Sequence, residues 1–432
     1  MKHAVVLLEG AATAGQTPGV AGTLLADAHT PVLRTLCRAG RVGRAALWPT
    51  GSPLTIETAV LTLAGYDASA TGVPSAAFVA AGLRQSLSES DAVFFARLVT
   101  LDTDGPRGIL PRRPKRVLLD PAAGGITETE SKTLGADLLA HLRAALPDVG
   151  ASLDLVPVAG NSFVLIERSG ADYRSVVAPA PELDGDEPAA LALPSGNAAA
   201  TEVLSRLLSL AESFLARHEI NIARVEQGLL PANALWVWDP SRRPGLTPLA
   251  ASFPLSTALT TPSVGVAGVA TCIACPVTRV KNPSPRSVAD AAIPALAQRD
   301  LVIAHVPVRS APGVSDALAA EALAQADLKL IAPLADHVLH GKTPGRLLVV
   351  ATPVGVRPAR RGAPPQSVIA IIGGGFAPTV ERAFTDADAA ASELVIDSGR
   401  DLLEFFLSSG RSAPAPVIRV KRVSAPAQER SL

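Results

Sequence analysis

The sequence predicts an α/β fold: a mostly parallel sheet flanked by helices, with a small α+β domain inserted into the chain. Short β-branched runs alternate with Ala- and Leu-rich helical runs, which is typical of parallel strands joined by helical crossovers. Continuous apolar runs such as 301–306 (LVIAHV) fit strands that are buried on both faces. Two Pro-rich stretches in the middle of the chain break the alternation and predict an insertion.

The elements of the core are predicted from both ends of the 432-residue chain. Residues 3–8 (HAVVLL) indicate the first strand, and a helix is predicted at 30–39. Toward the other end, strands are expected at 300–306, 346–352 and 367–375. Helices are expected at 315–340 and 398–408.

The inserted α+β domain is predicted at 107–178, which leaves 1–106 and 179–432 as a discontinuous core domain. A basic, Pro-rich stretch at 105–117 and a Pro- and Asp-rich stretch at 176–194 indicate the two linkers. Between them the sequence predicts one helix with an acidic first turn, followed by two strands.

The composition argues against several classes of function. Lys and Arg together number 39, Asp and Glu also number 39, and aromatic residues make up 3%, so neither a nucleic acid nor an anionic membrane is an expected partner. Three cysteines are too few for a disulfide framework. The stretch 244–278 has no charge, but Pro, Ser and Thr interrupt it, and we expect buried strands there. We expect a soluble, cytoplasmic protein.

Several hydroxyl residues precede an apolar helix in the stretch 50–67 (TGSPLTIETAVLTLAGYD). Ser52 followed by Pro53 predicts the helix start, as a cap and a Pro in the first helical position, and Gly65 predicts its end. Capping explains these hydroxyls, because a nucleophilic Ser or Thr also needs an activating base or metal, and none is visible nearby.

Two motifs have structural interpretations that we favour over metal binding. Cys272 and Cys275 form a CxxC, but only Cys37 remains to complete a zinc set, and the context predicts a strand with buried cysteines. His337 and His340 lie one turn apart near a helix end, where a protonated His is favoured by the helix dipole.

Arg242 and Arg243 follow a predicted strand that contains two alternating Trp residues (ANALWVWDPSRRPGL). Arginines at the C-terminal end of a strand suit anion binding in α/β folds. Ordinary solvation of the two side chains is equally compatible with this pattern.

Six segments occur in an order and spacing that resemble those of a known family: TPVLRTLCRAGRVGRA, ETAVLTLAGYD, FFARLVTLD, GGITETESKTLGADLL, PANALWVWDPSRRPGL and DLVIAHVPVRSAPGVSD. They are similar to segments of the archaeal-type 2,3-bisphosphoglycerate-independent phosphoglycerate mutases of the alkaline phosphatase superfamily. The resemblance implies an alkaline-phosphatase-like core. It also implies a glycolytic isomerase activity by metal-dependent phosphoryl transfer.

The resemblance further implies two divalent metals, which Asp and His side chains hold around a nucleophilic Ser. The corresponding metal positions in this sequence are Glu9, Ser310, Val314, Thr352, Pro353 and Gly362. Glu9 keeps a carboxylate, although a longer one, and the others are neutral. The sequence therefore predicts no metal cofactor.

The resemblance places Ile56 at the position of the nucleophilic Ser and Glu57 at that of the following Asp. Thr55 is the nearest hydroxyl, but one residue turns a helix by about 100°, so Thr55 is not expected to point where the Ser would. The substrate-binding Arg and Asn of the family correspond to Phe95 and Arg97.

We therefore expect a degenerate member of the family: a pseudoenzyme with a binding or regulatory role toward an unknown protein or a small anionic ligand. The anion-binding candidates are Arg242, Arg243 and Arg97. The alternative is an active mutase or a related phosphate-ester enzyme that uses Mn or Zn in a site rebuilt from Glu9, Thr55, Glu57 and Ser310.

Overall fold

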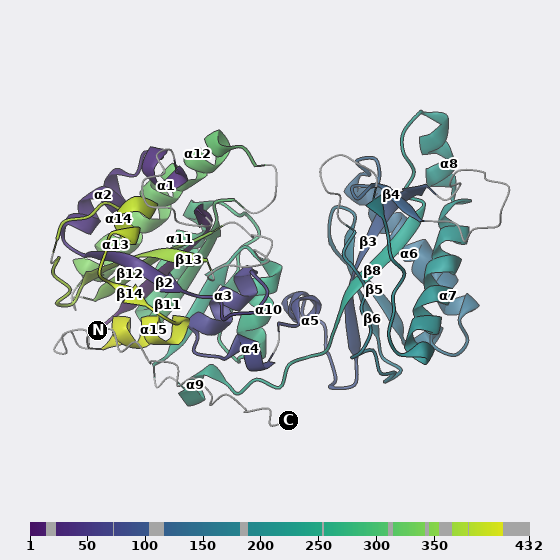
Figure 1. The fold of residues 1–432 in the computed structure, drawn as a ribbon, viewed down its shortest axis with the longest axis horizontal. Coiled ribbons are helices and arrows are strands. Elements are labelled where there is room, and N and C mark those ends of the chain that lie inside the picture. Colours follow the sequence, from purple (N-terminus) through teal and green to yellow (C-terminus); the bar gives the residue numbers. More distant parts are fainter. Residues whose placement is uncertain are drawn as a thin grey trace, which may run out of the picture. The chain divides into compact units, whose positions relative to one another are not determined.

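A computed structural model describes most of the chain (Figure 1), and the described residues are 1–13, 23–71, 73–102, 116–181, 189–252, 255–309, 314–341, 345–353, 365–378 and 380–408. These residues divide into two units. The first comprises residues 1–50, 62–66 and those from 292 onward, and the second comprises 51–61 and 67–291.

The larger sheet has eight strands in the order β10-β9-β11-β1-β12-β13-β2-β14. Their bounds are β1 (His3–Ala12), β2 (Arg41–Ala46), β9 (Thr257–Thr261), β10 (Val277–Arg279), β11 (Leu301–Pro307), β12 (Arg346–Pro353), β13 (Gln366–Gly373) and β14 (Val395–Ile396). β1 runs parallel to both β11 and β12, whereas β13 runs antiparallel to β12 and β2. The mostly parallel sheet predicted from the sequence is confirmed.

The centre of this sheet is formed by strands that are apolar along most of their length. In β1, the run from Val5 to Leu8 is 0% exposed, and every residue of β12 is buried. Strands buried on both faces need continuous apolar sequence rather than alternation, which explains the patterns HAVVLL and RLLVVAT.

The helices of the first unit include the predicted ones at 30–39, 315–340 and 398–408, together with two short helices, at 24–27 and 386–390, that were not predicted. They are α1 (Leu24–Asp27), α2 (Pro31–Arg38), α12 (Asp316–Ala326), α13 (Ala332–Leu339), α14 (Asp386–Ala390) and α15 (Gly399–Leu407). A π-helical segment, Asp327–Ile331, joins α12 to α13. The buried Asp327 carboxylate accepts hydrogen bonds from the backbone nitrogens of Val32 and Leu33, so it caps the first turn of α2.

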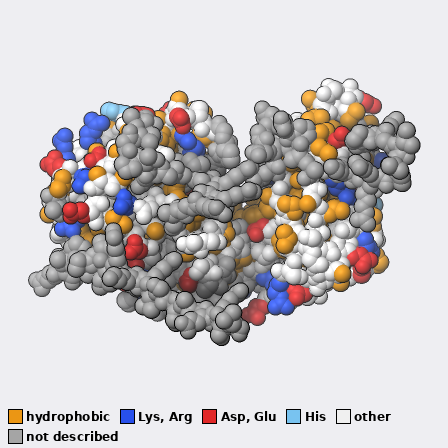
Figure 2. Space-filling model, in the orientation of Figure 1, with side chains coloured by type: hydrophobic (Ala, Val, Ile, Leu, Met, Phe, Trp, Pro, Cys, Tyr) orange, Lys and Arg blue, Asp and Glu red, His pale blue; other side chains and the backbone are white. Residues whose placement is uncertain are grey.

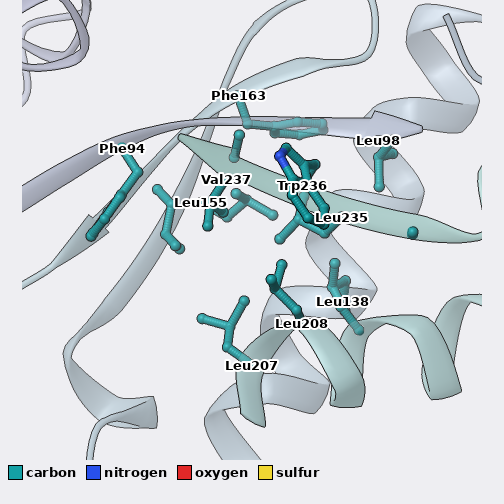
Figure 3. Packing of buried hydrophobic residues seen from close by; sticks show 14 of the residues in the cluster. Phe94, Leu98, Leu138, Leu155, Phe163, Leu207, Leu208, Leu235, Trp236 and Val237 are labelled. Atoms are coloured by element: carbon teal, nitrogen blue, oxygen red, sulfur yellow. The ribbon is translucent and has the colours of Figure 1, made fainter. Parts of the chain in front are cut away.

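The second unit contains an antiparallel sheet in the order β5-β6-β3-β4-β7, with β8 paired to β3. The strands are β3 (Ala92–Asp102), β4 (Val117–Asp120), β5 (Leu153–Ala159), β6 (Ser162–Glu167), β7 (Ala189–Ala190) and β8 (Ala234–Ser241). Helices α6 (Glu128–Ala145) and α7 (Ala198–Leu215) cover one face. Figure 3 shows Leu138, Leu207 and Leu208 of these helices pointing toward Leu235 and Trp236 of β8.

This sheet contains strands from within the insertion predicted at 107–178 and strands from the sequence before and after it. β3 precedes that range and β8 follows it, yet the two strands pair with each other, and β3 also pairs with β6. The Pro-rich stretches indicate linkers between domains, but they carry no information about which sheet a neighbouring strand joins. The prediction therefore left β3 and β8 in the core domain.

The remaining helices are α3 (Ile56–Leu63), α4 (Ala68–Thr71), α5 (Ser75–Gly82), α8 (Glu219–Glu226), α9 (Leu249–Ser252), α10 (Val264–Cys272) and α11 (Pro285–Gln298). The charge-free stretch 244–278, predicted as strands, contains α10 as well as β9, so the strand prediction was wrong for α10. Cys272 ends that helix and Cys275 follows a turn at Ala274 (φ 52°). Among the described helices, none is both long enough and apolar enough to cross a bilayer.

Candidate functional site

The C-terminal ends of three neighbouring parallel strands meet in the first unit. In the register of β1 with β11, Leu7 lies opposite His305 and Glu9 opposite Pro307. In that of β1 with β12, Leu8 lies opposite Ala351. Ligands of open α/β sheets bind outside the carboxyl ends of the strands, so this edge is the candidate site.

Glu9 and His305 form the central pair of this edge. Glu9 Oε2 lies 3.0 Å from His305 Nε2, so the imidazole donates and the carboxylate accepts. The His305 side chain is 0% exposed and that of Glu9 is 24% exposed. Gly10 follows with φ 74°, and a Cβ there would overlap the carbonyl oxygen of Arg309. Only Gly permits this close approach of the two chain segments.

The other predicted metal positions offer few donors. The Thr352 hydroxyl accepts from Gly10 N at 3.3 Å and donates to the Leu8 carbonyl at 3.4 Å, and Pro353 and Val314 have no side-chain donor atom. Ser310 and Gly362 lie outside the described residues. Within the described part of the chain, no three His, Cys, Asp or Glu side chains come together as a metal-binding group.

The predicted nucleophile position lies at the first turn of α3, in the second unit. Ile56 is the first helical residue, and Thr55 Oγ1 accepts from Thr58 N at 3.3 Å and lies 3.1 Å from Thr58 Oγ1. The predicted cap at Ser52 is corrected: Thr55 caps this helix, because it directly precedes the first helical residue and its Oγ1 accepts from Thr58 N. Gly65, with φ 88°, ends it as predicted.

Glu57 packs against the first turn of α10. A Cβ at Gly265 would overlap Glu57 Oε1, so the carboxylate lies directly beside the backbone there. Ser263 Oγ accepts from Val266 N and caps the same helix. A negative charge at a helix N-terminus is favoured by the helix dipole, which gives Glu57 a structural role.

Arg97 lies on β3 beside two aromatic rings of the second unit. Its guanidinium carbon is 5.4 Å from the centre of the Trp238 ring, and the Phe95 ring is also 5.4 Å from that of Trp238. Arg97 Nε donates to Ser162 Oγ at 3.4 Å. The cation therefore stacks on an aromatic surface, which stabilises it in place.

The three arginine candidates do not form one cluster. Arg242 donates to the Ala171 carbonyl at 2.9 Å, and the exposed Arg243 approaches the Leu87 carbonyl at 3.5 Å. Since Arg97 lies opposite Trp236 whereas Val93 lies opposite Ser241, Arg97 and Arg242 are about five residues, roughly 17 Å, apart along the sheet. Arg242 and Arg243, which are adjacent in sequence, place two positive charges together, whereas Arg97 contributes one.

Sequence reasoning missed two residues of the same segment, Asp239 and Ser241. Asp239 Oδ2 accepts from Ala76 N, and Ser241 Oγ accepts from Ala77 N, so both side chains cap the N-terminus of α5. Burial raises the pKa of the Asp239 carboxyl. The Asp-Pro pair in WDPS was the available signal, since Asp tolerates the positive φ of 54° found here.

His305 was also missed. It was visible as the one titratable side chain inside the apolar strand LVIAHV, and a polar group in such a strand requires a buried partner. That partner, Glu9, is 296 residues away in sequence.

Comparison with known proteins relates the chain to one family. A family model described as 2,3-bisphosphoglycerate-independent phosphoglycerate mutase matches residues 37–221. An enzyme of that name from Methanosarcina barkeri is 25% identical over 85% of this chain and 90% of its own length. A probable enzyme of that name from Geobacter sulfurreducens is 27% identical over 71% of this chain and 74% of its own length.

Solved structures share the fold. The PH0037 protein from Pyrococcus horikoshii has a TM-score of 0.68 and 20% identity, and covers 94% of this chain and 96% of its own. A cofactor-independent phosphoglycerate mutase from Thermoplasma acidophilum has a TM-score of 0.60 and 19% identity, and covers 95% and 100%. The alkaline-phosphatase-like architecture extends over nearly the whole chain.

Proposed function

Because the chain belongs to the family of 2,3-bisphosphoglycerate-independent phosphoglycerate mutases, we propose that it is a pseudoenzyme that keeps the family's fold and acts by binding. One observation carries the proposal: the polar side chains at the reactive positions are engaged within the protein, Glu9 with His305 and Thr55 with Thr58. Ile56, at the position of the nucleophile, has no atom that can attack phosphorus.

The donor chemistry supports this proposal. Two-metal phosphoryl transfer requires several carboxylates and imidazoles around both ions, whereas Glu9 is the one carboxylate at the described metal positions. Clustered ligand charges without a metal would be costly to bury, and neutral side chains such as Val314 and Thr352 avoid that cost. The fold is therefore expected to be stable without metal.

Metal content and mutase activity of the purified chain test the proposal. After treatment with a chelator and dialysis against Mn²⁺, Zn²⁺ or Mg²⁺, elemental analysis should find no stoichiometric metal, and 3-phosphoglycerate should not be converted to 2-phosphoglycerate. The Methanosarcina barkeri relative, assayed in parallel, is the positive control. Stoichiometric metal together with interconversion would overturn the proposal.

A working phosphate-ester enzyme with a rebuilt metal site is the second candidate. The Glu9 side chain favours it, because its carboxylate is 24% exposed at the C-terminal edge of the sheet. This site would use Glu9, Thr55, Glu57 and Ser310 with Mn or Zn. A metal-dependent activity that disappears in the Thr55→Ala variant would support it against the pseudoenzyme.

A small anion is the ligand class that Arg242 and Arg243 support. If they bind one, millimolar 3-phosphoglycerate or sulfate should raise the melting temperature, since a ligand that binds only the folded state stabilises it. The Arg242→Ala/Arg243→Ala variant should lose this shift, whereas Arg400→Ala, which removes an exposed cation elsewhere, should retain it. An unchanged shift in the double variant would rule these arginines out.

The cytoplasm is the compartment we propose. The three cysteines are free thiols in the structure, which agrees with a reducing environment. Fractionation of cells that make the protein tests this assignment, and recovery with a membrane or secreted fraction would contradict it.

A further inference from the structure

Helix α8 of the second unit buries two polar residues and exposes two apolar ones, whereas a surface helix usually buries its apolar residues. Asn221 and Arg224, one turn apart, are 2% and 5% exposed. Ile222 and Val225, also one turn apart, are 48% and 58% exposed, and Leu229 just beyond the helix is 45% exposed. Ile222, Val225 and Leu229 are here called the α8 stripe.

Hydrogen bonds of Asn221 fix the start of this helix. Its Nδ2 donates to the carbonyl oxygens of Leu215 and Ala232, each at 2.9 Å, and its Oδ1 accepts from Ala232 N at 2.8 Å. A buried amide with these partners is well satisfied. The helix therefore does not need Ile222 or Val225 to hold it in place.

Arg224 fixes the other end of α8. It donates to the carbonyl oxygens of Ala123, Gly124 and Leu230 at 2.8–3.3 Å, and pairs with Glu130 at 3.3 Å. These bonds hold α8 as a rigid ridge. A surface that is already ordered loses little conformational entropy when it binds.

The outer surface of α8 is apolar with an acidic border. Figure 2 shows hydrophobic side chains gathered where Figure 1 places α8. Glu219 and Glu226 are exposed at the two ends of the helix, and Arg224, the one cation of α8, is buried and paired. Exposed apolar clusters with a polar border are typical of protein interaction sites.

We propose that the α8 stripe docks into an apolar groove of a partner protein whose rim carries Lys or Arg side chains. Ile222 and Val225 have the i, i+3 spacing of anchors of a helix in a groove, and Leu229, beyond the helix, adds to the exposed apolar surface. A basic rim would pair with Glu219 and Glu226 and orient the complex. This inference rests on the proposed binding function and names the partner's chemistry, but it does not involve the metal positions.

A second copy of the chain fits this surface less well. In a two-fold interface each partner presents the same residues, so Glu219 and Glu226 of both copies would bring four carboxylates together. α8 supplies no exposed cation to balance them, and like charges at an interface are repulsive.

Three variants of the full-length chain test the proposal. Ile222→Asp/Val225→Asp removes the stripe, and Glu219→Lys/Glu226→Lys reverses the border. Leu318→Asp is the matched control, since Leu318 is 61% exposed on α12. Each substitution is at an exposed position and should change stability by no more than about 0.5 kcal/mol, which circular dichroism melting checks.

The tagged chain is first used to retain proteins from an extract of its native cells. Proteins held by the wild type and by Leu318→Asp, but not by the stripe variant, are identified by mass spectrometry and purified. Calorimetry with the purified partner should show binding at least tenfold weaker for both the stripe and the border variants, and weaker at high salt for the wild type.

Three results would overturn the inference. One is that no retained protein depends on the stripe. Another is that the purified partner binds the stripe variant or the border variant as tightly as the wild type. The last is that light scattering finds a wild-type dimer that becomes a monomer in the stripe variant, which would make a second copy the occupant. None of these results affects the metal and mutase measurements, so either proposal can fail alone.

Discussion

His3, at the start of β1, shows how burial changes a single titrating side chain. It is 6% exposed, its ring meets the edge of Phe406 at 5.5 Å, and its Nδ1 has no hydrogen-bond partner among the described residues. Burial, and then the positive charge of Arg346, lower the pKa of His3 from 6.5 to about 4. The folded protein therefore holds this imidazole neutral where the unfolded chain would protonate it.

Stability should consequently fall as the pH is lowered from 6.5 to about 4. In this window the unfolded state binds more protons than the folded state, so the free energy of unfolding decreases with falling pH. The loss attributable to His3 is about 3 kcal/mol at most. Urea denaturation across this range should show a smaller loss for His3→Gln. The control His340→Gln, at an exposed position, should match the wild type, and equal slopes for all three would contradict the assignment.

Thr55 and His305 show what single-residue reasoning can and cannot find. A capping hydroxyl ahead of α3 was predictable, but Ser52 was chosen because Pro53 favours a helix start, whereas the helix begins at Ile56 and Thr55 caps it. The pairing of His305 with Glu9 depends on the register of β11 beside β1. No local pattern contains that information.

Helices α5 and α10 show how an element is positioned by its smallest residues. A Cβ at Gly268 of α10 would overlap the carbonyl oxygen of Phe78, and a Cβ at Gly82 of α5 would overlap that of Val264. The two helix backbones are therefore in direct contact. Small residues at a helix crossing permit such close approach, as in other packed helix pairs.

Gly268→Val should destabilise the protein strongly, because the added side chain has no room between the two helices. Overpacking of this kind costs about 1–3 kcal/mol, and sometimes more, which thermal or urea denaturation would detect. Gly245→Val is the control, since no atom lies within 4 Å of a Cβ at that position. Equal stability of the two variants would contradict the close packing.

Most elements were predictable from their apolar period, and α10 shows why some were not. Its residues 265–270 are all buried, and a helical stretch buried on every side lacks the amphipathic period that distinguishes it from a buried strand. α6, by contrast, has the capping box of Thr127 and Glu130, and its acidic first turn identified it from the sequence.

At the scale of the whole molecule, an apolar β1 lies at the centre of a sheet shared with known phosphoglycerate mutases. The parallel arrangement followed from the alternation of strands and helices. The extent of the second sheet could not be predicted in this way, because the pairing of β3 with β8 joins segments on either side of the predicted insertion.

The stability of the whole chain should be independent of divalent metal. A ligand that binds only the folded state raises the melting temperature, so a chain with a metal centre melts at a lower temperature after chelation. Here EDTA and added Mn²⁺ should give melting temperatures within about 1 °C of each other. A saturable increase of the melting temperature with Mn²⁺ would indicate a bound ion and contradict the proposal that the chain is a pseudoenzyme.

The position of β1 also has a consequence for how the protein is made. Both neighbours of this strand, β11 and β12, begin after residue 300. At roughly 5–20 residues per second, a ribosome needs about 15–60 s to translate the intervening stretch. For that time β1 is without either of its native neighbours, and its apolar run Val5–Leu8 is a segment that a ribosome-associated chaperone would shield.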